Sequence, residues 1–483
     1  MAAEDKTLNA LFLPYFITSH MTPMIDTAIL FAAGRRDTTV TILTTPSNAA
    51  MFHHATSAGG GRIKFHTVNF PSAESGLPDG VENSGAITSK DMIPKFTLAI
   101  SLLQKPIENS IRDLRPHFIV SDVMQPWTVD IAEELNIPRL ILSTSNCFNC
   151  CVYHQLKIHK PYEKVRSESE SFVVPGLPDE IEMTSAQIED YLKKPEESGS
   201  SGEMIKLIDD AEIRSYGMVF TSFEEIESDY VQHYKNVIGR KSWHIGLPSM
   251  FPKGENETNT ERHRCLNWLD NQESGSVLYV SFGSMTRFPD TQFTEIAMAL
   301  EESGHSFVWV VKKIGKIGEK EEEEDWLPEG FPERVLESNK GLIVRDWAPQ
   351  ISILAHPAIG GFMTHCGWNS SLEGMAAGVP LITWPLFAEQ FYNEKLIVRV
   401  LKIGVEVGSG VWNRSPQILS PVLGKDKIVK AVRRLMDGSE EAEEIRGRAK
   451  EVSVMIKKAV GEGGSSSSDL NNLIEELRAH VLH

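Results

Sequence analysis

Short apolar segments alternate with helical patterns along the first half of the chain, and this alternation restricts the fold more than any other feature. Thr22 offers a side-chain cap and Pro23 suits a first helical position, so a helix is predicted over residues 23–33. A second helix is predicted over residues 127–135. A strand–helix–strand order of this kind gives a parallel sheet covered by helices on both faces. The predicted strands are residues 8–14, 39–45, 118–120 and 140–142.

The same alternation starts again after a polar, proline-containing stretch near residue 250. A chain of 483 residues is too long for one ordinary core, and this stretch has the composition of a linker. We expect an α/β fold with one doubly wound domain over residues 1–250, a linker over 251–262 and a second domain over 263–462. A flexible break is expected at 463–468, before a short final helix over 469–479. The predicted strands of the second half are residues 277–282, 307–311, 342–344, 358–363 and 381–384, and its predicted helices are 289–302, 350–355 and 370–377.

Bulk properties exclude several classes of function. The formal net charge of −18, from 48 basic and 66 acidic residues, opposes binding to nucleic acid and to an anionic membrane surface. The amino-terminal segment begins with acidic residues and is a poor signal peptide, and no stretch of about 18 apolar residues exists. We therefore expect a cytoplasmic protein, without stable membrane insertion, that acts as a monomer on small molecules.

The five cysteines predict neither a metal site nor a disulfide framework. Cys147, Cys150 and Cys151 are clustered, but they lack the second ligand pair that a zinc site needs. A sparse, odd set in a long chain is typical of reduced thiols in a cytosolic protein. We expect no metal and no cofactor.

A candidate anion site follows the strand predicted at residues 358–363. Its sequence, HCGWNSSLE at residues 365–373, contains Gly367, which lets a backbone approach closely, and Asn369 or Ser370, which can cap the next helix. Free amides at the start of that helix suit a diphosphate, His365 adds a ring donor, and Glu373 could bind a ribose diol. A strand–glycine–helix junction is common, so this segment alone is weak evidence.

Polar and aromatic residues on either side of this segment extend the candidate site. Trp347 could stack on a base, and Gln350 could pair with an amide-like base edge. Glu389 and Gln390 could hold sugar hydroxyls, because a carboxylate accepts hydrogen bonds while a carboxamide both donates and accepts. Each of these residues, taken alone, is more often an ordinary surface residue.

The segment over residues 347–390 begins with WAPQ, contains HCGWNS and ends in EQ. It resembles, from end to end, the signature box of plant family 1 UDP-dependent glycosyltransferases. SFGS at 281–284, WHIG at 243–246 and SHMTP at 19–23 match the same family. The resemblance implies a GT-B architecture of two Rossmann-like domains that face a central cleft, with the carboxy-terminal helix over 469–483 packing back on the first domain. It also implies an inverting UDP-sugar-dependent transferase, and a terminal Gln390 favours UDP-glucose.

The resemblance assigns site residues to both halves of the chain. It implies that Trp347 stacks on uracil, that Glu373 binds the ribose and that Ser284 helps to hold the diphosphate. Thr144 of the TSN segment is a further sugar contact. The donor-binding residues carried over are Ser284, Trp347, Ala348, Gln350, His365, Gly367, Trp368, Asn369, Ser370, Glu373, Glu389, Gln390 and Thr144.

His20 and Asp122 are the predicted catalytic pair. An acceptor hydroxyl must lose a proton as it attacks the anomeric carbon, and histidine titrates nearest neutral pH. We expect His20 in the loop before the first helix, at the end of the first strand, and Asp122 just past another strand of the same sheet, where it would orient the ring. A loop histidine and a capping aspartate are the alternative interpretations, and both positions match the family's catalytic pair. The reaction would be a single in-line displacement without a metal.

The acceptor is predicted less sharply than the donor. Candidate wall residues are aromatic side chains that are more often core residues: Phe16, Phe96, Trp127, Phe148 and Phe391. Triterpenoid or steroid sapogenins are the favoured acceptors, followed by flavonoids or a glycoside whose sugar chain is extended. A UDP-sugar epimerase or hydrolase and a non-catalytic nucleotide-sugar binder are the alternatives from other classes. A nicotinamide-dependent enzyme would need a GxGxxG after the first strand, where this chain has PYFITSH.

Overall fold

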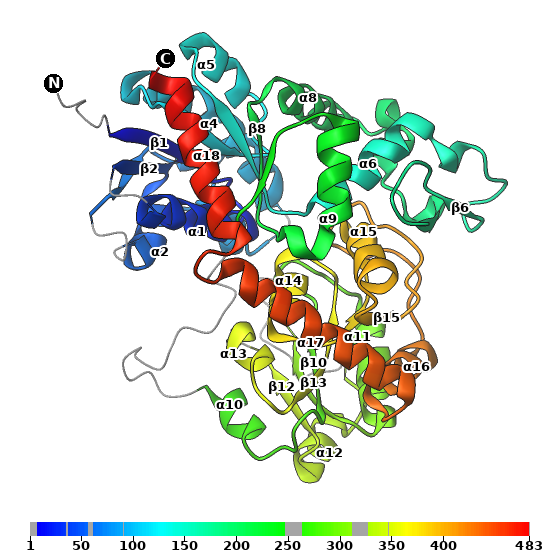
Figure 1. The fold of residues 1–483 in the computed structure, drawn as a ribbon. Helices are drawn as coiled ribbons and strands as arrows, with labels where there is room; N and C mark the ends of the chain where they lie inside the picture. The colour runs from blue at the N-terminus through cyan, green and yellow to red at the C-terminus, as the bar shows by residue number, and fades with distance from the viewer. Residues whose placement is uncertain are drawn as a thin grey trace.

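Two lobes, each built on a parallel sheet, make up the protein (Figure 1). The computed structural model describes residues 7–34, 37–56, 61–89, 91–246, 263–311, 327–345 and 347–482. The linker predicted over 251–262 lies outside the described residues. No helix in the described ranges is long and apolar enough to cross a membrane.

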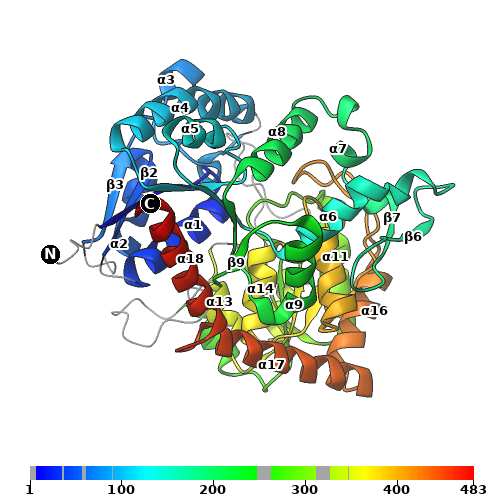
Figure 2. The same ribbon diagram turned by 45° about the horizontal axis from the view of Figure 1, so that its top comes forward.

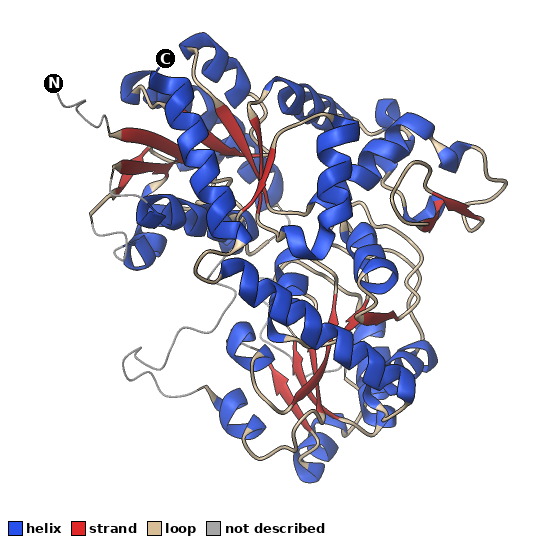
Figure 3. Cartoon of the chain, viewed as in Figure 1, coloured by secondary structure: helices blue, strands red, loops and turns tan. Residues whose placement is uncertain are grey.

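The amino-terminal sheet has seven strands in the order β3-β2-β1-β4-β5-β8-β9, and every neighbouring pair is parallel. Its central strands are apolar and buried on both sides, because helices cover both faces (Figure 3). The strands are β1 (Leu8–Leu13), β2 (Thr38–Thr44), β3 (Ile63–Thr67), β4 (Phe118–Asp122), β5 (Arg139–Ser143), β8 (Gly217–Phe220) and β9 (Ser242–His244).

The helices of this lobe follow the strands in the expected alternation. A short antiparallel hairpin, β6 (Ser171–Val173) and β7 (Glu182–Thr184), projects from the side of the lobe (Figure 3). The principal helices are α1 (Thr18–Gly34), α2 (Pro46–Thr56), α4 (Met92–Leu114), α5 (Thr128–Leu135), α6 (Cys147–His159), α8 (Ser200–Arg214) and α9 (Glu224–His233), with the shorter α3 (Ser72–Ser75) and α7 (Asp190–Lys193).

The carboxy-terminal sheet has six parallel strands in the order β12-β11-β10-β13-β14-β15. The strands are β10 (Val277–Ser281), β11 (Ser306–Val310), β12 (Gly341–Val344), β13 (Ile359–Thr364), β14 (Leu381–Thr383) and β15 (Gly404–Glu406). The helices are α10 (Arg264–Leu269), α11 (Asp290–Ser303), α12 (Phe331–Ser338), α13 (Gln350–Leu354), α14 (Trp368–Ala377), α15 (Gln390–Lys395), α16 (Lys425–Met436), α17 (Glu440–Val460) and α18 (Ser465–Leu482).

The last helix, α18, leaves the second lobe and packs on the first (Figures 1 and 2), beside α1 and β9. Leu473, Ile474 and Leu477 of α18 are fully buried in the core of the amino-terminal sheet. Asp469 Oδ2 accepts a hydrogen bond from the His244 amide at 2.8 Å. The flexible break predicted over residues 463–468 is wrong from Ser465 onward, because α18 already begins at Ser465. The Ser465 hydroxyl donates to Glu225 of α9 at 2.5 Å.

Candidate active site

His20 and Asp122 meet at the carboxyl ends of β1 and β4, which are neighbours in the first sheet. His20 Nδ1 lies 2.9 Å from Asp122 Oδ2. The carboxylate is completely buried, and its Oδ1 accepts a hydrogen bond from the Met124 amide at 2.9 Å. Because a carboxylate only accepts hydrogen bonds, His20 donates from Nδ1 and keeps Nε2 free as a base.

The predicted position of His20 in a loop is wrong, because α1 begins at Thr18 rather than after Thr22. His20 therefore stands in the first turn, where its amide donates to the Ile17 carbonyl at 2.9 Å. Pro23 does lie inside the helix and has no N–H to offer the carbonyl four residues earlier. That carbonyl, of Ser19, accepts a hydrogen bond from Asn369 Nδ2 of the other lobe at 3.0 Å. The proline thus leaves a main-chain acceptor that joins the two lobes beside His20.

The electrostatic environment of His20 comes from both lobes. Burial lowers its pKa, but the charge and hydrogen bond of Asp122, together with the charge of Glu389, outweigh burial, so the pKa is raised. The pKa of Glu389 is raised, because burial outweighs the opposing charge of His20. Glu389 therefore lies within electrostatic reach of the candidate base, although the two residues come from different lobes.

The first turn of α14, which follows β13, lies against the first lobe, because Asn369 Nδ2 bonds to the Ser19 carbonyl. The N-cap of α14 is Gly367, and no side chain caps the helix. The predicted caps, Asn369 and Ser370, are instead the second and third residues of α14, so that prediction is wrong. The first-turn amides of α14 thus have no competing side-chain cap, and the positive end of the helix dipole favours an anion there.

The His365 ring lies close to two glycines, Gly283 and Gly367. A Cβ on Gly283 would lie 2.7 Å from its Cε1, and a Cβ on Gly367 would lie 2.5 Å from its Nε2. Burial lowers the pKa of His365 to about 4, and its Nδ1 has no partner among the described residues. The ring is therefore a neutral donor, and the two glycines are needed because any side chain would displace it.

Three side chains that the resemblance assigns to the nucleotide, those of Gln350, Ser370 and Glu373, form one half-buried polar group. Gln350 Nε2 donates to Glu373 Oε2 at 2.7 Å and to Ser370 Oγ at 3.2 Å. Tyr279 of β10 donates to Gln350 Oε1 at 3.1 Å, a contact that the sequence did not reveal because Tyr279 reads as an ordinary strand residue. Burial raises the pKa of Glu373 to about 7. Trp347 is 77% exposed, which leaves its ring free to stack, and its neighbour in the sequence, the half-buried Ala348, packs on the core.

The residues expected at the sugar differ in their exposed surface and in the hydrogen-bonding atoms that the protein itself already uses. Gln390 Oε1 accepts from the amides of Leu386 and Phe387 at 2.9 and 3.1 Å, so its oxygen already holds its own loop. The Trp368 ring is 2% exposed and packs in the core, so it has almost no surface left for a sugar. Ser284 is exposed after β10, and Thr144 is half-buried after β5.

Three of the five predicted acceptor-wall residues are core residues. Phe16, Phe148 and Phe391 are at most 2% exposed, which corrects their assignment to a pocket wall. Phe96 is 8% exposed and stacks on Phe70 with ring centroids 6.1 Å apart. Trp127 is half-buried and packs beside the same core. Burying a large aromatic ring is favourable wherever a core can take it, which is why such residues are poor indicators of a pocket.

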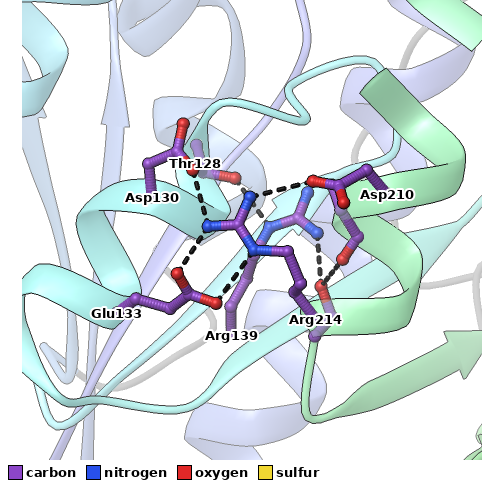
Figure 4. Close-up of polar contacts among 8 residues, drawn as sticks. Thr128, Asp130, Glu133, Arg139, Asp210 and Arg214 are labelled. Atoms are coloured by element: carbon purple, nitrogen blue, oxygen red, sulfur yellow. Dashed lines mark hydrogen bonds and ion pairs between the residues drawn. The ribbon is translucent and has the colours of Figure 1, made fainter. Parts of the chain in front are cut away.

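Arg139 at the start of β5 holds the loop that follows Asp122, the last residue of β4, and Figure 4 shows its guanidinium group beside Thr128 of α5. Arg139 Nε donates to Ser121 Oγ at 2.9 Å and to Thr128 Oγ1 at 2.7 Å, and a terminal nitrogen donates to the Gln125 carbonyl at 3.2 Å. It thereby holds the loop between β4 and α5 at both ends. Burial lowers the pKa of Arg139 to about 10. Beside it, Arg214 pairs with three more exposed carboxylates, those of Asp130, Glu133 and Asp210.

Known proteins resemble this chain over nearly its full length. A family model described as "UDP-glucoronosyl and UDP-glucosyl transferase" matches residues 102–408. UDP-glucose flavonoid 3-O-glucosyltransferase 7 of Fragaria ananassa is 46% identical over 99% of this chain and 98% of its own. Soyasapogenol B glucuronide galactosyltransferase of Glycine max is 43% identical over 99% of this chain and 97% of its own. Among solved structures, UGT73P12 of Glycyrrhiza uralensis complexed with glycyrrhetinic acid 3-O-monoglucuronide matches with a TM-score of 0.90 at 42% identity, covering 99% of this chain and 96% of that one.

Proposed function

Because the chain belongs to the UDP-glucoronosyl and UDP-glucosyl transferase family and is a UDP-glycosyltransferase of GT-B architecture, we propose that it transfers glucose from UDP-glucose to a lipophilic plant metabolite. The observation that carries this proposal is the meeting of two groups across the cleft. The His20–Asp122 pair of the first lobe lies beside Ser19, whose carbonyl is bonded to Asn369 of the amide-bearing turn in the second. A base and an anion site on facing lobes suit group transfer between two bound substrates.

In the proposed mechanism His20 Nε2 accepts the proton of the acceptor hydroxyl. Asp122 holds the Nδ1–H and stabilises the imidazolium that forms. The hydroxyl attacks the anomeric carbon from the face opposite UDP, so an α-linked donor gives a β-O-glycoside. The first-turn amides of α14 and the neutral His365 ring donate hydrogen bonds that stabilise the negative charge developing on the diphosphate. We expect turnover without an added metal, because these donors supply the stabilisation that a divalent ion supplies elsewhere.

The favoured acceptor class is a triterpenoid or steroid sapogenin. This preference is supported by a relative named for soyasapogenol B glucuronide and by a neighbour bound to glycyrrhetinic acid 3-O-monoglucuronide. Both names also describe an acceptor that already carries a sugar, so extension of a sugar chain is the second candidate. A flavonoid acceptor has comparable support, from the Fragaria relative at 46% identity.

One assay separates these candidates. The purified protein is incubated with UDP-glucose, UDP-galactose or UDP-glucuronic acid and with a panel of sapogenins, their monoglucuronides and flavonoids. Products are identified by mass and by anomeric configuration, and UDP release is measured in parallel. We expect β-glucosides and acceptor-dependent UDP release; release without an acceptor would indicate a hydrolase, and binding without turnover would indicate a nucleotide-sugar binder.

A further inference from the structure

Asn393 of α15 connects the two lobes through both ends of its carboxamide. The residue is completely buried. Its Oδ1 accepts hydrogen bonds from Asn146 Nδ2 at 2.7 Å and from Asn149 Nδ2 at 2.9 Å, both in the first lobe. Its Nδ2 donates to the Cys366 carbonyl at 2.8 Å and reaches Glu389 Oε1 at 3.5 Å, both in the second lobe.

The contact with Cys366 acts on the turn that forms the anion site. Cys366 has a φ of +64°, a left-handed conformation that is strained for a residue with a side chain. The Cys366 amide donates to Thr364 Oγ1 at 3.3 Å, and its carbonyl is held by Asn393. This turn aims His365 between its two glycines and leads directly into the free amides of α14. Holding the carbonyl therefore keeps the strained turn in place.

The contacts in the first lobe fix the turn from β5 into α6. Asn146 is the N-cap of α6, and its Oδ1 accepts from the Asn149 amide at 2.8 Å, which leaves Nδ2 to reach Asn393. Asn149 Nδ2 also donates to Ser145 Oγ at 2.5 Å. Thr144, a predicted sugar contact, lies in this same turn.

Among common side chains only a carboxamide satisfies all these partners. One end of the group must accept two N–H bonds, and the other must donate to a carbonyl and toward a carboxylate. An ionised aspartate would place an acceptor against the Cys366 carbonyl and the Glu389 carboxylate. A leucine of similar size would leave three buried polar groups and the half-buried Glu389 with one fewer partner each.

We propose that Asn393 is a positioning residue for glycosyl transfer. It fixes the position of the diphosphate-binding turn relative to α6 of the first lobe. It thereby sets the distance between the donor's anomeric carbon and His20. It acts through Cys366 and α6 without touching either substrate. The inference rests on the donor placement proposed above.

The test compares Asn393→Asp and Asn393→Leu with Gln292→Leu. Gln292 is a matched control because it is a buried carboxamide, 4% exposed, whose two ends, among the described residues, bond only to the main chain of Leu423 inside the second lobe. For each variant the melting temperature, the Kd for UDP by calorimetry, kcat and both KM values are measured. We expect both Asn393 variants to weaken UDP binding roughly tenfold and to lower kcat roughly tenfold, with the acceptor KM within about twofold. Gln292→Leu should lower only the melting temperature.

A second set of variants keeps the inference testable if Asn393 variants fold poorly. Asn149→Ala removes one contact from the other side of the cleft and should raise the Kd for UDP several-fold. Where Asn393→Leu folds, this effect should disappear in the double variant, because the same link is already broken. Where Asn393→Leu does not fold, an unchanged Kd for UDP in Asn149→Ala would by itself overturn the inference. Fully additive effects, or Asn393 variants whose Kd and kcat match Gln292→Leu, would overturn the inference. A wild-type protein that fails to bind UDP, or a His365→Ala variant that binds it normally, would instead overturn the donor placement.

Discussion

A single imidazole in this protein responds to carboxylates from two lobes. Asp122 contacts His20 directly, and Glu389 acts on it from across the cleft. Both favour the protonated ring, while burial opposes it, and the net effect is a raised pKa. A base with a raised pKa binds the acceptor's proton more tightly, at the cost of being protonated at a higher pH.

Removing the base should abolish most turnover. We expect His20→Ala to lower kcat about 10²–10⁴-fold, since this is the usual contribution of a general base, while the Kd for UDP stays close to that of the wild type. Product formation by mass spectrometry and UDP calorimetry check the two parts. A variant that keeps the original rate would exclude His20 as the base.

The pH dependence should identify the role of Asp122. Wild-type kcat/KM should fall as the pH drops through the pKa of His20, which lies above its ordinary value. Asp122→Asn removes the charge that raises this pKa, so the acidic limb should move to lower pH while the maximal rate falls. Rate measurements from pH 5 to 9 reveal both changes, and an unmoved acidic limb would show that His20 does not control it.

The two glycines around His365 should be sensitive to a single methyl group. Gly367→Ala would place a Cβ 2.5 Å from His365 Nε2, so the ring must move and the Kd for UDP should rise about tenfold or more. Gly447→Ala in α17 has no atom within 4 Å of the added Cβ and should leave UDP binding unchanged. Equal affinities for the two variants would contradict the proposed role of the His365 ring.

At the scale of elements, the site is built from the ends of helices and strands rather than from their middles. The start of α1 and the end of β4 bring His20 and Asp122 together, while α14 contributes amides and α15 contributes Asn393. These ends are held by side chains that lie outside the reacting region. Arg139 at the start of β5 holds the loop between β4 and α5, although no carboxylate is among its hydrogen-bond partners in the described chain.

Arg139 should matter more for stability than Arg214. Arg139→Met would leave buried oxygens of Ser121 and Thr128 with fewer partners, and we expect a loss of about 1–3 kcal/mol in the free energy of unfolding. Arg214→Met breaks three ion pairs, but its partners are more than half exposed, so the loss should stay below about 1 kcal/mol. Urea unfolding of both variants measures the difference, and the reverse order would contradict this account.

At the scale of the molecule, α18 follows the second lobe in the sequence but packs against the first lobe. Its apolar residues complete the core of the first sheet, and Tyr216 donates to Glu476 at 2.8 Å at the margin of this contact. The core of the first lobe therefore includes residues that follow the whole second lobe in the sequence.

Truncating one buried side chain of α18 tests this packing. Leu477 is completely buried, and Leu477→Ala should reduce the free energy of unfolding by about 2–5 kcal/mol. Val454→Ala on α17, at a side chain that is 66% exposed, should change it by less than about 0.5 kcal/mol. Chemical denaturation compares the two, and similar losses would show that α18 is only loosely attached.

The sequence by itself determined the alternation of strands and helices and the two-lobed class of fold. These follow from local patterns: β-branched runs, glycines where backbones approach, and a signature segment whose order and spacing are read directly. The strand positions were predicted to within one or two residues for β1, β4 and β13. Helix starts were predicted less well, since α1 begins at Thr18 and α18 at Ser465, where the first residue of α18 bonds to Glu225, which lies 240 positions earlier.

Only the tertiary structure decided which of these residues meet. The link from Asn393 to Asn146 spans 247 positions, and the support of Gln350 by Tyr279 spans 71. No local pattern encodes such contacts, since each depends on how two elements pack. Burial likewise assigned Phe16, Phe148 and Phe391 to the core and made His365 a neutral donor, because desolvation is set by everything that surrounds a side chain and not by its neighbours in the sequence.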